Sequence, residues 1–123
     1  MYTHFFIYFI DEPPEIINHP ESFKEISPGK TVAFTVQATG TEPMSYRWEW
    51  KPAMDGDGSE EWQSCSTEMF SGTESSTLVI SSVQKPNEGS YRSVISNYAG
   101  SKTSQPAKLC VGKNANTYSQ VCR

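Results

Sequence analysis

The sequence contains little that would support catalysis. Its only histidines, His4 and His19, stand apart from each other and from any serine or cysteine nucleophile pattern. It also lacks a glycine-rich phosphate loop, metal-ligand spacing and a nucleophile elbow. We therefore expect no enzyme activity, no catalytic or metal-binding residues and no cofactor.

Positive charge is also scarce. The 123 residues include 10 Lys and Arg against 14 Asp and Glu, which gives a formal net charge of −4. Nucleic-acid backbones and anionic membrane surfaces are bound by basic patches, and none stands out along the chain. We expect no nucleic-acid partner.

The apolar run at the N-terminus, MYTHFFIYFI, is short. A membrane-spanning helix needs ~20 apolar residues, and the run lacks the basic segment and the small-residue cleavage site of a signal peptide. The prolines of the following DEPP sequence favour a boundary or the start of an edge strand. We interpret residues 1–12 as an apolar leader or an extra edge strand, and expect no membrane insertion by the domain itself.

Cysteine is limited to Cys65, Cys110 and Cys122. An odd number leaves at least one thiol unpaired in a monomer, and no spacing resembles a CxxC metal or redox pair. Sequence does not reveal whether Cys65 and Cys110 form a bridge, and free thiols are the preferred interpretation. No N-x-Ser/Thr sequon occurs, which favours an intracellular chain or a domain taken from a longer one.

Alternation of apolar and polar residues predicts strands throughout the middle of the chain. A short first strand at residues 15–18 is broken at Pro20 and resumes at 23–26. Residues 31–39 alternate cleanly. In residues 45–51 the aromatic Tyr46, Trp48 and Trp50 share one face, and charged residues occupy the other, as in a half-buried strand.

Residues 77–100 form the most informative stretch. Leu78 and Ile80 alternate, and the NEGSY sequence of residues 87–91 leads into a second alternating run. A tight corner with Tyr91 just inside the second strand is typical of a tyrosine corner. A final strand is expected within 102–111, with Pro106 marking an edge or a bulge. Short strands, frequent turns and no helical period predict an antiparallel two-sheet sandwich.

These residues resemble the immunoglobulin superfamily, and its I-set most closely, over residues 13–112. The strand-B frame of the family appears as Gly29, Val32, Phe34, Val36, Ala38 and Gly40, and the strand-C tryptophan as Trp48. The frame of strands E and F falls on Leu78, Ile80, Val83, Asn87, Gly89, Tyr91, Ser93, Ile95, Asn97 and Gly100. The resemblance implies an all-β, immunoglobulin-like sandwich of Greek-key connectivity. Residues 113–123 have no apolar period and are predicted to form a flexible tail.

The chain departs from the family at both cysteines of the inter-sheet disulfide, where it has Val36 and Ser93. Loss of such a bridge typically costs ~2–5 kcal/mol, which Val36 would partly offset by packing against Trp48. A buried Ser93 hydroxyl would need a hydrogen-bond partner. The structural core implied by the resemblance is disulfide-free and includes Val36, Trp48, Leu78, Tyr91 and Ser93.

The acidic loop before Trp62 invites a calcium interpretation, because carboxylates are the ligands that calcium prefers. The sequence DGDGSEE at residues 55–61 does not fit the EF-hand frame, however, so a solvated acidic loop is preferred. Trp62 itself is either part of a binding hot spot or a cover for the sheet edge.

The resemblance implies a noncatalytic module for protein–protein interaction within a larger receptor, adhesion or scaffold protein, with another protein or a second copy as partner. The candidate binding surface combines the charged face of residues 45–51 with the acidic loop: Arg47, Glu49, Lys51, Asp55, Asp57, Glu60, Glu61 and Trp62. The alternative is a structural spacer domain of an intracellular, muscle-type protein, with no dedicated binding site. The family favours an extracellular location and the missing disulfide and sequons an intracellular one, so localisation stays open.

Overall fold

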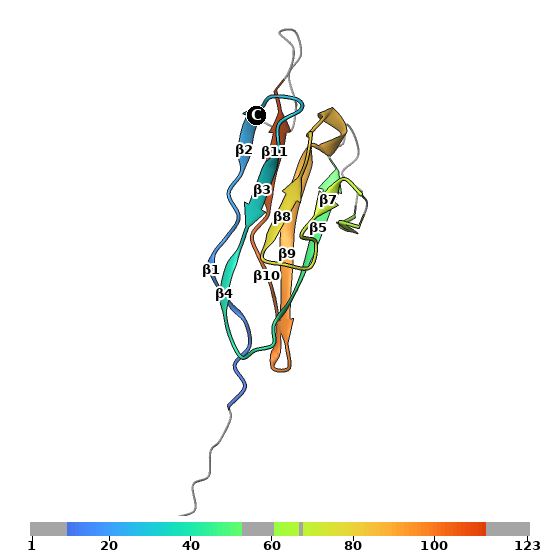
Figure 1. The fold of residues 1–123 in the computed structure, drawn as a ribbon. Coiled ribbons are helices and arrows are strands. Elements are labelled where there is room, and N and C mark those ends of the chain that lie inside the picture. The colour runs from blue at the N-terminus through green and yellow to red at the C-terminus, as the bar shows by residue number, and fades with distance from the viewer. Residues whose placement is uncertain (1–9, 53–60, 67, 113–123) are drawn as a thin grey trace, which may run out of the picture.

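The computed structural model describes residues 10–52, 61–66 and 68–112 (Figure 1). The predicted leader lies mostly outside this range, and the predicted tail entirely. In order, the elements are β1 (Glu15–Asn18), β2 (Phe23–Ile26), β3 (Val32–Thr35), β4 (Gln37–Thr39), β5 (Ser45–Pro52), β6 (Gln63–Ser64), β7 (Phe70–Ser71), β8 (Thr77–Ile80), the 3-10 turn η1 (Lys85–Asn87), β9 (Gly89–Asn97), β10 (Gly100–Thr103) and β11 (Ala107–Val111).

The strands form two layers that face each other (Figure 1). One layer contains the β1–β4 pair and the sheet β3–β8–β7, and the other the sheet β2–β11–β9–β5–β6, with β10 also paired to β9. All pairs are antiparallel except β2 with β11, which is parallel. The predicted all-β sandwich is confirmed, and the parallel pair is the one departure from an antiparallel arrangement among the described strands.

The first strand changes sheets. β1 pairs with β4 in one layer, and after Pro20 the chain crosses over and β2 pairs with β11 in the other. Proline has no N–H to donate to a ladder, so pairing ends where Pro20 stands. The kinked first strand therefore follows the sequence pattern, and it brings the first and last parts of the domain side by side.

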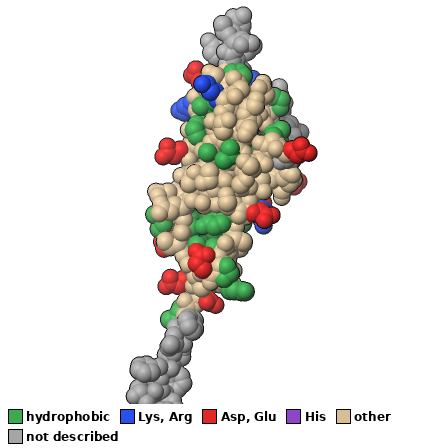
Figure 2. Space-filling model, in the orientation of Figure 1, with side chains coloured by type: hydrophobic (Ala, Val, Ile, Leu, Met, Phe, Trp, Pro, Cys, Tyr) green, Lys and Arg blue, Asp and Glu red, His purple; other side chains and the backbone are tan. Residues whose placement is uncertain are grey.

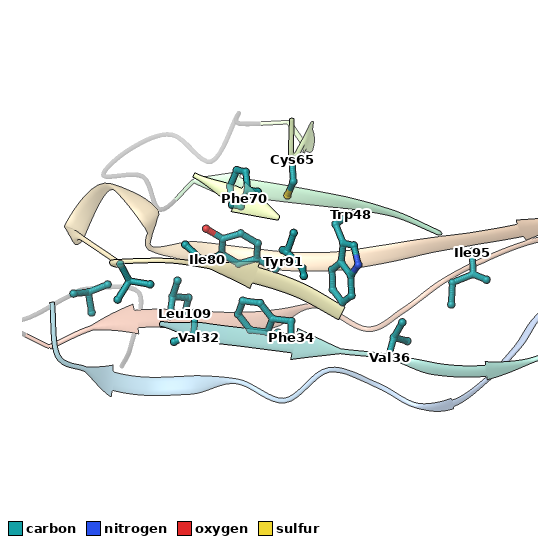
Figure 3. Close-up of a cluster of buried hydrophobic side chains, with 14 residues drawn as sticks. Val32, Phe34, Val36, Trp48, Cys65, Phe70, Ile80, Tyr91, Ile95 and Leu109 are labelled. Carbon is teal, nitrogen blue, oxygen red and sulfur yellow. The ribbon is translucent and has the colours of Figure 1, made fainter. Parts of the chain in front are cut away.

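Aromatic side chains fill the space between the layers (Figure 3). The rings of Phe34 and Tyr91 stack with centroids 4.9 Å apart. Trp48 is fully buried, and its Nε1 donates a 2.8 Å hydrogen bond to the carbonyl of Ser75. The Tyr91 hydroxyl donates a 2.6 Å hydrogen bond to the carbonyl of Asn87, which forms the tyrosine corner that the sequence predicts.

Each of the five residues assigned to the core from sequence is buried: Val36, Trp48, Leu78, Tyr91 and Ser93. Ser93 differs from the rest because its Oγ has no hydrogen-bond partner. Its backbone N–H donates a 2.9 Å hydrogen bond to the Oγ of Ser104. Burial of an unpaired hydroxyl is unfavourable, so the serine at this position weakens the core.

The cysteines depart in part from the prediction. Cys65 is a free, buried thiol, which excludes a bridge between Cys65 and Cys110. The preferred interpretation of Cys110 as a free thiol is wrong, because Cys110 is disulfide-bonded. Its side chain is buried. Cys122 lies outside the described residues.

Candidate functional surface

The outward face of β5 carries a connected group of charged side chains. Burial of Trp48 and partial burial of Tyr46 and Trp50 turn the intervening residues outward, since successive strand residues point to opposite faces. On this face Glu49 lies directly opposite Arg92 of β9. The Nε of Arg92 donates to Glu49 Oε1 at 2.9 Å, and Arg47 Nη2 lies 3.3 Å from Oε2 of the same carboxylate.

Trp62 completes this group from the position just before the edge strand β6. It directly precedes β6, which pairs with β5 at Glu49 and Trp50. The guanidinium carbon of Arg92 lies 4.0 Å from the centroid of the Trp62 ring, and Lys51 Nζ lies 5.8 Å from it. Both cations are within the range of cation–π attraction. The half-buried indole therefore covers the sheet edge and also belongs to the charged surface.

The structure thus brings together four of the residues predicted to bind a partner: Arg47, Glu49, Lys51 and Trp62. Glu61 is exposed beside Trp62. The other three residues of the prediction, Asp55, Asp57 and Glu60, lie outside the described residues. Any calcium site in the acidic loop would also fall largely there.

Sequence reasoning missed Arg92, which holds the group together. Its signal was present, because the alternation of Tyr91, Ser93 and Ile95 inward leaves Arg92 outward on β9. What the sequence did not contain was the register that places Arg92 opposite Glu49. We call Arg47, Glu49, Lys51, Trp62 and Arg92 the β5–β9 surface.

A second surface feature lies at the end of the sandwich where β9 turns into β10. Tyr98 is 82% exposed there. Beside it, a hollow of about 310 Å³ is lined by Pro43, Met44, Ser45, Ser96, Asn97 and Tyr98. It contains no ionisable side chain other than the Tyr98 phenol, so its polar contacts are limited.

Among the described residues, two buried ionisable groups, Cys65 and Tyr91, have raised pKa values. Burial, with a smaller contribution from Glu49, raises the pKa of Cys65 to about 12, which keeps the thiol protonated and unreactive at neutral pH. Burial and the neighbouring Cys65 likewise raise the pKa of Tyr91. In the same part of the chain, no cluster of three or more His, Cys, Asp and Glu is placed to hold a metal ion. None of its helices is long and apolar enough to span a membrane.

Comparison with known proteins agrees with this geometry. A family model described as immunoglobulin domain matches residues 13–97. The chain belongs to the immunoglobulin domain family. No curated protein sequence matches this immunoglobulin domain, whereas solved structures do.

Three solved structures illustrate the similarity of this immunoglobulin domain to known ones. Extracellular domains 3–5 of Drosophila OTK are 29% identical with a TM-score of 0.62, over 84% of this chain and 33% of that one. The titin M3 domain is 24% identical with a TM-score of 0.63, over 83% of this chain and 99% of that one. The N-terminal Ig1-2 module of the Drosophila receptor protein tyrosine phosphatase DLAR is 25% identical with a TM-score of 0.62, over 81% of this chain and 46% of that one.

The share of each solved structure that aligns with this chain shows how large the similar unit is. This chain spans about a third of the OTK fragment and nearly all of titin M3. The likeness is therefore to one immunoglobulin domain, a noncatalytic type of module that occurs in receptors and in titin.

Proposed function

We propose that this domain is a protein-binding module of a larger receptor, adhesion or scaffold protein, and that it binds through the β5–β9 surface. The observation that carries the proposal is the packing of Trp62 on Arg92, whose guanidinium is itself hydrogen-bonded to Glu49. Tryptophan and arginine are the residues most enriched in binding hot spots.

The geometry of the β5–β9 surface favours binding because its large side chains are already ordered. Arg92 is held from one side by the Glu49 carboxylate and from the other by the Trp62 ring. Ordering a long side chain costs roughly 0.5–1.5 kcal/mol on association. A surface that is ordered before the partner arrives avoids part of that cost.

Capture experiments with paired variants test the proposal. The immobilised domain, its Trp62→Ala variant and its Tyr98→Ala variant are exposed to the same protein fraction. We expect a partner that binds the unaltered domain and Tyr98→Ala but is lost from Trp62→Ala. Equal capture by the three proteins, or no captured species together with a monomeric domain in sedimentation equilibrium, would contradict a binding role for this surface.

The spacer function is a second proposal, supported by the parallel pairing of β2 with β11. The described chain begins at one end of the sandwich and β11 ends at the other (Figure 1). Force applied at the two ends would load the hydrogen bonds between β2 and β11 together, in shear. Single-molecule stretching of a tandem polyprotein tests this: unfolding at high force favours a spacer, and unfolding at low force contradicts it.

A further inference from the structure

Two lysines flank one serine on the outward side of the larger sheet. Ser90 of β9 lies directly opposite Lys51 of β5 on one side and opposite Lys108 of β11 on the other. Residues directly opposite in a ladder share a face, and the burial of Ala107 and Leu109 confirms that Lys108 points outward. With strands about 4.8 Å apart, the two lysines are roughly 10 Å apart at their bases.

This row extends the β5–β9 surface. Arg92 stands two residues beyond Ser90 on β9 and therefore on the same face. The outward positions of β5, β9 and β11 thus contain the cations Arg47, Lys51, Arg92 and Lys108 and the single carboxylate Glu49, a formal charge of 4 − 1 = +3. The whole chain has a formal charge of −4, so positive charge is concentrated here.

The opposite face has no such charge. The ladder positions of β3, β7 and β8 that point outward are Ala33, Thr35, Ser71, Thr77 and Val79. Figure 2, which views this side, shows charged side chains mainly at its margins. The concentration of cations is therefore a property of one sheet face and not of the surface as a whole.

The four cations of this sheet face differ in whether they form ion pairs with described residues. Arg47 and Arg92 share the Glu49 carboxylate. Lys51 and Lys108 have no ion pair in the part of the chain that the structure describes. Two ammonium groups that form no ion pair with the described residues, with a serine hydroxyl between them on the sheet, are suited to anionic groups about 10 Å apart.

We propose that this row, Lys51–Ser90–Lys108 together with Arg92, docks an acidic, extended segment of a partner protein that crosses the strands. The inference rests on the proposed function and names the chemistry of its partner. In a polyproline II segment, residues three apart share a face and are separated by about 9 Å, close to the spacing of the two lysines. Acidic residues at every third position would therefore reach both ammonium groups.

Fluorescence polarisation with a labelled peptide of repeating Glu-Pro-Ser units tests the proposal, with the matched Gln-Pro-Ser peptide as the neutral probe. The domain should bind the acidic peptide. The affinity for this peptide should fall roughly three- to tenfold in the variant K51Q/K108Q. The control variant K30Q/K102Q removes the same charge elsewhere, because Lys30 lies in a turn and Lys102 opposite the inward Ile95. It should bind as the unaltered domain does.

Each of the following binding results would overturn the inference: equal binding of both peptides, equal losses in the two double variants, or no binding of the acidic peptide at low ionic strength. None of them contradicts the broader proposal, which depends on whether Trp62→Ala abolishes partner capture. Self-association that K51Q/K108Q abolishes would also overturn the inference of an acidic partner segment, since the row would then be an interface between copies of this chain.

Discussion

The guanidinium carbon of Arg92 lies 4.0 Å from the centre of the Trp62 ring, while its Nε donates to Glu49. One arginine thereby joins a central strand, its neighbour and the residue that enters the edge strand. Because Trp62 packs on a side chain and is only half-buried, it is suited to contact a partner as well as the sheet.

Trp62→Ala should therefore reduce the free energy of unfolding only modestly, by about 1 kcal/mol, since a partly exposed cation–π contact contributes about 0.5–1 kcal/mol. Trp50→Ala is the matched variant. Trp50 is partly buried and packs on the core residues Phe70 and Tyr91, so its truncation should cost more, about 3 kcal/mol, at the low end of the range for large aromatic residues in a core. Urea unfolding of both measures the difference, and equal losses would show that Trp62 has a purely structural role.

Ser93→Ala should raise the stability of the domain by about 1 kcal/mol, because it removes a buried hydroxyl that has no partner. Ser104→Ala should do the opposite, since the Ser104 Oγ accepts from the Ser93 N–H and donates to the carbonyl of Gln105. The denaturant midpoints of the two variants show whether each variant gains or loses stability. A loss of stability in Ser93→Ala would mean that its hydroxyl is satisfied in solution.

The double variant V36C/S93C should form the bridge that most members of the family have between these positions. With the bridge formed, it should be about 2–4 kcal/mol more stable than S93C alone under the same non-reducing conditions. Mass spectrometry under non-reducing conditions establishes the bridge, and S93C alone is the control. A confirmed bridge without a gain in melting temperature would contradict the assignment of Val36 and Ser93 to those positions.

Stability should fall in alkaline solution because Cys65 is buried. Its pKa is raised from 9.0 to about 12 in the folded state, so above pH 9 the unfolded chain releases a proton that the folded domain retains. The contribution of this thiol to the free energy of unfolding is complete below pH 9. It is lost between pH 9 and 12, at up to about 1.4 kcal/mol per pH unit. Urea unfolding at pH 8, 9 and 10 without reductant, which leaves the disulfide of Cys110 intact, should show this slope. Cys65→Ala should flatten it up to pH 10, above which Tyr91 also contributes.

The sequence contained enough to predict the parts of the fold that depend on local spacing. The hydrogen bond from Tyr91 to Asn87 spans four residues, and the alternation of Leu78 and Ile80 needs no distant partner. The strand break at Pro20 likewise follows from the chemistry of one residue. These features, together with the family pattern, were sufficient for the sandwich.

The surface was less predictable because it depends on distant pairings. Alternation along β5 exposed Arg47, Glu49 and Lys51, but only the register with β9 brings Arg92 to Glu49, 43 residues away. The position of Lys108 beside Ser90 depends in the same way on the pairing of β11 with β9. The disulfide of Cys110 also had no local signal in the sequence.

The most direct test of the binding surface is an NMR titration of the isotope-labelled domain with its captured partner. We expect shift changes at the backbone amides of residues 47–51 and 90–94 and at the Trp62 indole N–H. Shifts confined to residues 43–45 and 96–98, around the exposed Tyr98, would place the contact at the end of the sandwich and contradict the account.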